Sequence, residues 1–453
     1  MLKKYFLILS VFCFLLFSGN AYSQWTFAGG VTGAGDFPSI SVIDQNTVVV
    51  FGGPNGSPQV FLSTNGGATF TPITGTGMAS FELYCGWAVN ATTMFAGNGG
   101  GVGGTGGNAT FYRTTNGGTT WTSVLSTGSS AGFFNAIVFS RSMPTFGIGQ
   151  SDPPQGVGQP YYIPVTTDGG ATWTATFPPG VSGMASAQNA TVVIDDQFYG
   201  FGLGNTAPAR CYLTSNGGAN WYVGSHAGIT GGFVAGLAFN DDKMHGIMST
   251  SNSFPNVART TNGGLNWATV SLGGSGTTTL SSIKWITGTN MAYYIGRAAT
   301  GLCYKSTNNG QTWTSMTTAG LSGLSHFDFV RDGSNIYGYC IATDGSVLKL
   351  TDAVTSVEDP VSNIPAEYKL SQNYPNPFNP STTIEFSIPQ ASYVTLKVYN
   401  ALGKEVASII DAQMQPGNYS QQFVAAANLG SGVYFYKLTA GNFVETKKFV
   451  LTK

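Results

Sequence analysis

Short apolar runs alternate with polar turns at a regular spacing along the first 350 residues. In one such unit an apolar run from Thr191 is followed by the polar turn Asp195-Asp196 and by a second run that ends at Gly200. The stretch from Gly236 to Gly246 aligns with this unit position by position. Short apolar runs bounded by polar turns are typical of β-strands, so the pattern predicts an all-β fold.

A glycine-rich turn recurs six times in the same phase. Its first copy runs from Ser63 through Asn65-Gly66-Gly67 to Phe70, and consecutive copies are 51, 52, 48, 46 and 46 residues apart. Asparagine followed by glycine tolerates positive φ, so each copy predicts a tight hairpin. The spacing is that of one four-stranded propeller blade. The Asn or Asp positions are Asn65, Asn116, Asp168, Asn216, Asn262 and Asn308, and the aromatic positions are Phe70, Trp121, Trp173, Trp221, Trp267 and Trp313.

A seventh unit follows without the glycines of the turn. Asp352 lies 44 residues after Asn308, but the chain then changes composition and offers no outer strand. The segment that starts at Trp25 resembles the strand that follows a turn in the other units. We therefore expect it to supply the missing strand and to close a seven-bladed β-propeller over residues 24–350.

The first residues predict a secretory signal peptide. Lys3 and Lys4 precede an apolar run that ends at Phe17, and the small-x-small triplet Ala21-Tyr22-Ser23 follows. This order of charged, apolar and small residues predicts a signal over residues 1–23. No other stretch reaches about 18 apolar residues, so no integral membrane segment is expected after signal removal.

Composition narrows the classes of partner. Only 9% of the residues are charged, the net charge is −1 and 63 residues are glycine. Nucleic-acid binding needs a basic surface, so it is excluded. The cysteines Cys85, Cys211, Cys303 and Cys340 form no CxxC pair, and their state, free thiols or disulfides in an exported chain, is left open.

The histidines predict no metal site, and no cofactor is expected. His226, His245 and His326 share no ligand spacing. His245 aligns with Tyr199 in a second strand and is therefore expected in the core. Lys284 and Asp328 occupy equivalent, otherwise mainly apolar, positions of two innermost strands. Such charges are costly unless paired, so they are either an internal ion pair or a pair that lines the channel.

The six turns resemble the Asp-box (BNR) repeat of sialidases, sortilin-like receptors, some xyloglucanases and photosystem assembly factors. The resemblance implies the propeller and places the boxes on outer hairpins, away from the central pocket, so Asp168 is expected to be a turn residue. Residues 24–350 contain one glutamate, Glu82, and no Arg-Ile-Pro segment. This departs from the sialidase pattern, and no catalytic residue is assigned. Binding is expected instead at the loops near residues 97–108, 150–160, 203–209, 250–256 and 297–301 and at connectors such as 224–234.

The C-terminal part has a different pattern. Residues 351–367 hold four acidic side chains and no lysine or arginine, which predicts a linker. Residues 368–453 then alternate apolar and polar positions in about seven short runs, which predicts an Ig-like β-sandwich.

This module resembles the type A C-terminal sorting domain of the type IX secretion system. The matching residues are Asn373, Pro375, Asn376, Pro377, Phe378, Asn379, Pro380, Gly403, Lys404, Gly432 and Tyr434. The resemblance implies a Gram-negative bacterium of the Bacteroidota or a related group. It also implies export through the periplasm, type IX machinery as partner, and release or attachment at the outer-membrane surface.

The sequence thus predicts an exported propeller that acts as a non-enzymatic binding or structural passenger for an extracellular glycan or protein. The alternative is a sialidase- or xyloglucanase-like glycoside hydrolase that acts on extracellular glycans. Two acidic side chains about 5–10 Å apart at the channel mouth would favour the hydrolase.

Overall fold

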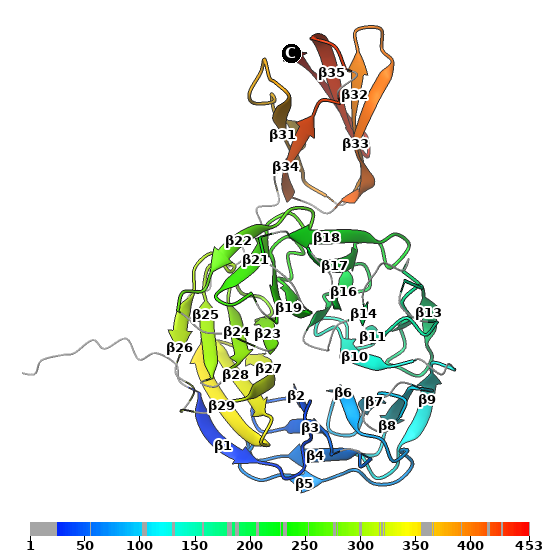
Figure 1. The fold of residues 1–453 in the computed structure, drawn as a ribbon, viewed down its shortest axis with the longest axis vertical. Helices are drawn as coiled ribbons and strands as arrows, with labels where there is room; N and C mark the ends of the chain where they lie inside the picture. The colour runs from blue at the N-terminus through cyan, green and yellow to red at the C-terminus, as the bar shows by residue number, and fades with distance from the viewer. Residues whose placement is uncertain are drawn as a thin grey trace, which may run out of the picture.

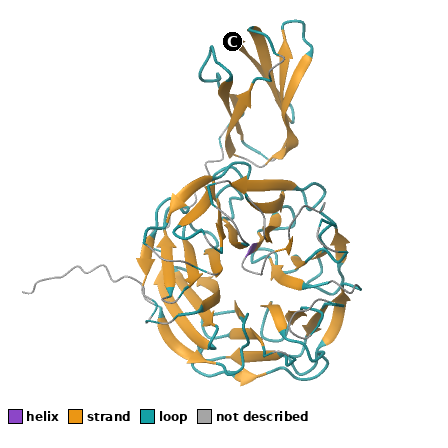
Figure 2. Cartoon of the chain, in the orientation of Figure 1, coloured by secondary structure: helices purple, strands orange, loops and turns teal. Residues whose placement is uncertain are grey.

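The computed structural model describes most of the chain from Trp25 to Thr452. The described residues are 25–54, 56–101, 107–128, 132–155, 158–178, 184–185, 190–204, 208–226, 228–229, 233–251, 253–274, 278, 280–298, 301–316, 318, 320, 322–354, 365, 367–390, 392–414, 417–426 and 429–452. The predicted signal peptide, most of the predicted linker and parts of the predicted binding loops lie outside them. Within them the named elements are all β-strands and no α-helix occurs, as the sequence predicts; the short helical piece drawn in Figure 2 corresponds to 3-10 geometry at Ala190.

The strands of the first 353 residues form antiparallel sheets arranged in a ring (Figure 1). From the centre outward, the first sheets are β2 (Ser39–Val42), β3 (Val48–Gly52), β4 (Gln59–Ser63), β5 (Thr71–Pro72); β6 (Leu83–Ala88), β7 (Met94–Asn98), β8 (Thr110–Thr114), β9 (Thr122–Ser126); and β10 (Phe134–Phe139), β11 (Gly147–Ser151), β12 (Ile163–Thr166), β13 (Thr174–Thr176). The next are β14 (Met184–Ala185) and β15 (Thr191–Val193) on β16 (Tyr199–Gly204), β17 (Ala209–Thr214), β18 (Tyr222–His226); and β19 (Val234–Phe239), β20 (Gly246–Thr250), β21 (Asn256–Thr260), β22 (Ala268–Ser271). The last are β23 (Leu280–Trp285), β24 (Ala292–Arg297), β25 (Leu302–Ser306), β26 (Thr314–Met316); and β27 (Leu324–Asp332), β28 (Asn335–Ala342), β29 (Ser346–Ala353), β1 (Thr26–Gly30).

The last of these sheets joins the two ends of the ring. β1 pairs antiparallel with β29, with Thr26 opposite Lys349 and Gly30 opposite Ser346. Trp25 is 2% exposed and its ring lies 5.9 Å from that of Phe329. The predicted pairing of the Trp25 segment is therefore confirmed, and it covers the edge that β29 would otherwise expose.

β29 runs three residues past the predicted end of the propeller at 350. Residues 351–353 pair with β28 rather than starting a linker. The Asp352 carboxylate accepts hydrogen bonds of 2.6 Å from the hydroxyl of Tyr293 and from the ammonium of Lys305. These side-chain contacts extend the strand, and the local acidic composition did not reveal them.

Neighbouring sheets pack face to face through aliphatic and aromatic side chains. Phe111 stacks on Phe134 of the next sheet with ring centroids 3.7 Å apart. Glycine is needed where a ring from one sheet presses on the backbone of the next. A Cβ on Gly86 would lie 2.2 Å from Cγ of Phe51, so no larger residue fits there.

The residues after 367 form two stacked sheets outside the ring (Figure 1). Their strands are β30 (Lys369–Leu370), β31 (Ser381–Ile388) and β34 (Gly417–Val424) in one sheet, and β33 (Glu405–Met414), β32 (Ser392–Asn400), β35 (Gly432–Ala440) and β36 (Phe443–Leu451) in the other. Alternate residues of β31 and β32, such as Ile384, Phe386, Leu396 and Val398, are buried between the sheets. The period of two in the sequence thus produces a sandwich with one apolar interior.

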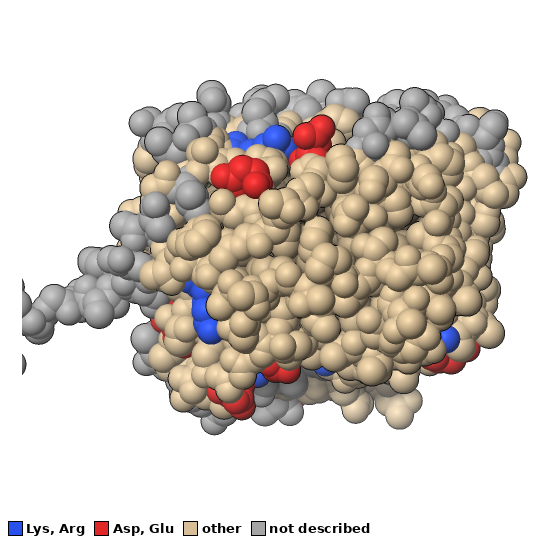
Figure 3. Space-filling view, turned by 90° about the horizontal axis from the view of Figure 1, so that it is seen from below, with Lys and Arg blue, Asp and Glu red and all other residues tan. Residues whose placement is uncertain are grey.

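Charged residues are sparse on the rim of the ring. Figure 3, which looks at the rim from below, shows a largely uncharged surface with Lys, Arg, Asp and Glu gathered mainly towards its upper and lower borders. No helix among the described residues has the length and apolar character needed to cross a membrane.

Replacing Trp25 by alanine tests the closure of the ring. We expect Trp25→Ala to lower the free energy of unfolding by about 3–5 kcal/mol, since a buried indole is lost. Its Nε1–H also donates to Sγ of Cys303 over 3.0 Å. Phe27, 61% exposed on the same strand, is the matched control, and Phe27→Ala should change stability by about 0.5 kcal/mol or less. Equal effects of the two substitutions in urea unfolding would contradict the role of Trp25.

The four cysteines of the described chain are free and buried, which the sequence left open. Burial raises the pKa of each thiol, to about 12 for Cys211 and Cys303 and further for Cys85, and well above its usual value for Cys340. Because the thiolate is the reactive form, an aromatic disulfide reagent should label none of the four rapidly in the native chain without its signal peptide. All four should react after unfolding without a reductant. Fewer than four would indicate a disulfide.

Candidate functional site

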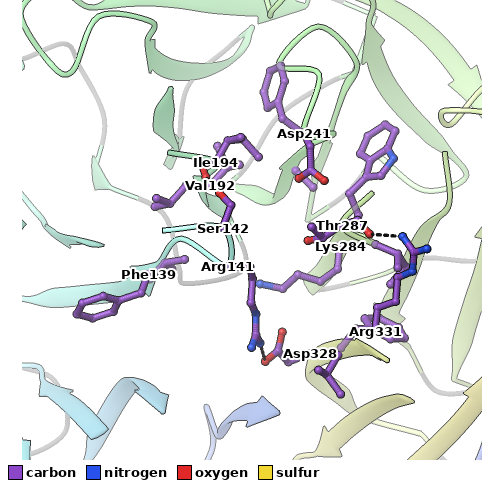
Figure 4. A pocket seen from close by; sticks show the side chains of 18 of the residues that line it. Phe139, Arg141, Ser142, Val192, Ile194, Asp241, Lys284, Thr287, Asp328 and Arg331 are labelled. Carbon is purple, nitrogen blue, oxygen red and sulfur yellow. Dashed lines mark hydrogen bonds and ion pairs between the residues drawn. The ribbon is translucent and has the colours of Figure 1, made fainter. Parts of the chain in front are cut away.

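A cavity of about 600 Å³ lies where the innermost strands of several sheets end (Figure 4). Its wall comes from the ends of β10, β15, β19, β23 and β27 and the turns after them, with Trp87 of β6. Apolar side chains such as Val192 and Ile283 form much of this wall. Arg141, Asp241, Lys284, Asp328 and Arg331 bring charge to it, in a chain with few charges.

Arg141, in the turn after β10, and Asp328 of β27 form an ion pair across the axis of the ring. The Asp328 carboxylate also accepts a hydrogen bond of 2.8 Å from the backbone N–H of Val42, and Arg141 donates to the carbonyl of Val42 over 2.9 Å. The guanidinium lies 4.7 Å from the ring centre of Trp87. One pair thus ties the sheets that contain β2, β6, β10 and β27 together.

The surroundings fix the charge states of Asp328 and His326. Burial alone would raise the pKa of Asp328, but Arg141, Lys284 and the hydrogen bond from Val42 lower it below its usual value. Burial, together with the charge of Lys284, lowers the pKa of His326 to about 3. The histidine is therefore neutral, and its Nδ1 accepts a hydrogen bond of 3.1 Å from the N–H of Ile40.

Lys284 points into the cavity near Arg141 (Figure 4). Among the described residues no hydrogen bond or ion pair to its ammonium is found. Burial lowers the pKa of Lys284; Asp328 partly offsets this effect and Arg141 adds to it. The structure therefore brings Lys284 and Asp328 to one cavity, while the direct ion-pair partner of Asp328 is Arg141.

The sequence analysis missed Arg141. It stands in the polar turn Ser140-Arg141-Ser142, after the end of β10, where a solvent-exposed arginine is the ordinary expectation. Only closure of the ring places that turn opposite β27. The signal available in the sequence was the unpaired Asp328 in an apolar column, which required a cation from elsewhere.

Asp241 and Arg331 lie at the mouth of the cavity. Asp241 accepts a hydrogen bond of 2.6 Å from the N–H of Gly288, and burial raises its pKa although this bond opposes the shift. Arg331 donates to the carbonyls of Thr287 and Gly288 over 3.1 and 3.0 Å. Both side chains therefore anchor the turn after β23, and the Asp241 carboxylate faces the cavity (Figure 4).

The six box turns lie between the third and outermost strands and do not line the cavity. In each, the first Ser or Thr donates to the Asn or Asp side chain over 2.9–3.0 Å and accepts from the N–H of the glycine two residues after that Asn or Asp. In the third box, hydrogen bonds, first those from Thr172, lower the pKa of Asp168 to about 2. This bonding is that of a turn residue, as the sequence suggested.

The cavity and the predicted binding loops lie at opposite ends of the strands: the cavity is where first and second strands connect, and the loops connect second and third strands. Binding at those loops stays a prediction. In contrast, the prediction that His245 is a core residue is wrong: it is partly exposed, and its Nδ1 lies 2.6 Å from the Asp242 carboxylate. It precedes β20, whereas the aligned Tyr199 lies within β16 and is fully buried.

The residues of the predicted sorting motif are divided between the sandwich core and its surface. Phe378 is 2% exposed and packs on Phe449 with ring centroids 5.0 Å apart. Asn373 donates to the carbonyl of Pro375 over 3.1 Å, and Asn376 accepts from the N–H of Val450 over 2.8 Å. Gly403, with φ of 77°, lies in an exposed turn. Lys404 follows it, and Pro375, Pro377, Asn379 and Pro380 form the exposed segment around Phe378, while Gly432 and Tyr434 belong to β35.

Comparison with known proteins separates the two parts of the chain. Residues 372–452 match the family described as the secretion system C-terminal sorting domain. The type IX sorting domain is thereby confirmed, and it marks the chain for the type IX machinery and for a secreted or outer-membrane surface location. No curated protein sequence matches the chain.

Solved structures resemble the ring. A structure of YCF48 bound to a D1 peptide has a TM-score of 0.53 at 15% identity and covers 74% of this chain and 98% of its own. An ancestral GH74 enzyme has a TM-score of 0.52 at 13% identity, and the match covers 94% of this chain and 64% of the enzyme. A structure of U3-55K has a TM-score of 0.52 at 10% identity, with 72% and 98% covered. YCF48 and the GH74 enzyme are β-propellers, and at these identities the likeness shows that fold alone.

The sequence analysis predicted neither a metal site nor a cofactor, and both statements stay predictions. Among the described residues no group of three or more His, Cys, Asp or Glu side chains is arranged to hold a metal ion.

A double-mutant cycle tests the pair across the ring. Arg141→Met leaves the buried Asp328 carboxylate without its cation and should cost about 3 kcal/mol of unfolding free energy. Adding Asp328→Asn to Arg141→Met should restore part of this loss, because the uncompensated charge is removed. Arg331→Met, at the mouth, is the control and should cost about 1 kcal/mol or less. Additive effects of the two substitutions in guanidinium unfolding would contradict a direct pair.

Proposed function

We propose that this chain is an exported passenger whose seven-bladed Asp-box propeller binds a ligand without transforming it. Residues 1–23 act as signal peptide in a bacterium of the Bacteroidota or a related group, and the sorting domain delivers the propeller to the cell surface or the medium. The ligand site is the cavity at the ends of the innermost strands. An extracellular glycan or protein is the partner class.

The state of the cavity carboxylates carries this proposal. A hydrolase of the two-carboxylate type needs one acid and one base or nucleophile that both reach the substrate. Asp328 instead pairs with Arg141 and accepts from the N–H of Val42. Its carboxylate is thus engaged in holding sheets together, which supports binding rather than bond cleavage.

The hydrolase alternative rests on one observation. Burial raises the pKa of Asp241 and the cations around Asp328 lower its pKa, and such a divergence is what an acid and its partner carboxylate require. The fold likeness to the GH74 enzyme is compatible with this reading but says nothing of activity. In this alternative Asp241 is the acid and Asp328 the second carboxylate.

Binding and turnover measured side by side test the proposal. The chain without its signal peptide is screened on an array of neutral and acidic oligosaccharides and on a peptide panel, and product release is followed for every ligand bound. We expect binding without product. Release of a shortened saccharide that Asp241→Asn abolishes would replace the proposal by the hydrolase.

A blocking substitution tests whether the cavity is the site. Ser142 lines the cavity, so Ser142→Trp should fill it and weaken binding at least tenfold. Ser123 is an exposed serine on the outermost strand β9, and Ser123→Trp should leave binding unchanged. Binding that persists in Ser142→Trp at full affinity would place the ligand elsewhere on the propeller.

A further inference from the structure

We propose that Lys284 anchors a carboxylate in the cavity and that the ligand is an acidic saccharide with one or two uronic acid units. This inference rests on the proposed function and gives its ligand class. Three observations support it: the Lys284 ammonium has no partner in the described part of the chain, the charged residues that line the cavity carry a net positive charge, and other lining residues can contact the hydroxyls and the ring of a sugar.

The first argument is the missing partner of Lys284. Its ammonium offers three hydrogen-bond donors, and no acceptor for them is found among the described residues. The side chain is partly buried, in a wall that includes Ile283 and Ile286. An ammonium in such a position is costly unless an anion accompanies it. The nearby carboxylate, that of Asp328, already accepts from Arg141 and Val42.

The second argument is the charge of the lining. Arg141, Lys284 and Arg331 contribute three cations, and Asp241 and Asp328 contribute two carboxylates. One positive charge therefore remains uncompensated among the lining residues. Arg331 donates to backbone carbonyls and Arg141 is paired with Asp328, so the excess positive charge is centred on Lys284. A ligand with one carboxylate would neutralise it.

The third argument concerns the rest of the ligand. The Asp241 carboxylate accepts one hydrogen bond from Gly288 and keeps further acceptor capacity for hydroxyl groups. Trp285, which follows Lys284 in β23, is partly buried and also lines the cavity, so an aromatic side chain is available there for the C–H groups of a sugar ring. A carboxylate, several hydroxyls and an apolar ring face are the features of a uronic acid. The volume of about 600 Å³ lies within the range of about 300–1,000 Å³ that small-molecule sites occupy.

The test uses digalacturonic acid and its dimethyl ester, which share the ring and its hydroxyls but differ in charge. Isothermal titration of the chain without its signal peptide should show binding of the acid and at least tenfold weaker binding of the ester. Lys284→Met keeps the length of the side chain and should lose this preference, whereas Lys284→Arg should retain it in part. Lys349→Met, a lysine outside the cavity, is the matched control and should bind as the original chain does.

A second readout follows Lys284 itself. Mass spectrometry after brief treatment with an amine-reactive reagent should show that the acid protects Lys284 and leaves Lys349 unaffected. Thermal unfolding shows that each variant is folded, and Lys284→Gln replaces Lys284→Met if the latter is not.

The outcomes separate this inference from the proposed function. Equal binding of acid and ester, or full binding by Lys284→Met, overturns the carboxylate subsite while ligand binding stands. Equal binding of acetate or of a glutamate-rich peptide overturns the saccharide class. If no glycan or peptide binds in a way that Ser142→Trp weakens, the proposed function fails as well.

Discussion

The pairing of β1 with β29 is the constraint on which the arrangement of this protein depends. A sheet that ends at β29 exposes a row of unpaired backbone groups. β1 lies in this last sheet and continues through residues 31–38 into β2 of the first sheet, so its pairing with β29 is what holds the first and last sheets together. The strand that follows Trp25 supplies the missing partner, and the buried indole holds it in place against β27. Residues at the two ends of the ring, more than 300 positions apart in the sequence, are thus hydrogen-bonded neighbours.

The position of the cavity is a consequence of this closure. Innermost strands of neighbouring sheets converge on one axis, so the turns at their ends meet there. Arg141 and Asp328 come from sheets that are distant in sequence, and their pair also contacts Val42 of a third sheet. The same interaction that stabilises the ring therefore occupies one carboxylate and leaves Lys284 unpaired. The Arg141–Asp328 pair therefore both stabilises the ring and leaves the Lys284 ammonium available for an anion.

The charged side chains that line the cavity stand out because the rest of the protein has few charges. With 9% charged residues, most of the interior and the rim seen in Figure 3 are neutral, whereas five charged side chains line a single cavity. Hydrogen bonds within the box turns satisfy the polar groups of the outer hairpins locally. The box turns therefore belong to the outer scaffold, whereas the charged side chains of the cavity come from the innermost strands and the turns after them.

The sequence by itself determined the strands, the box turns, the closing segment and the sorting domain, because each depends on local pattern: Asn65-Gly66-Gly67 dictates its own turn, and alternation along β31 dictates its own buried face. It also identified Lys284 and Asp328 as unusual, since a charge in an apolar column is visible without coordinates. The partner Arg141, the extension of β29 through Asp352 and the end of the ring at which the cavity lies were decided only by the tertiary structure. Each depends on contacts between residues of different sheets. Ring closure creates these contacts, and the neighbouring residues in the chain do not determine them.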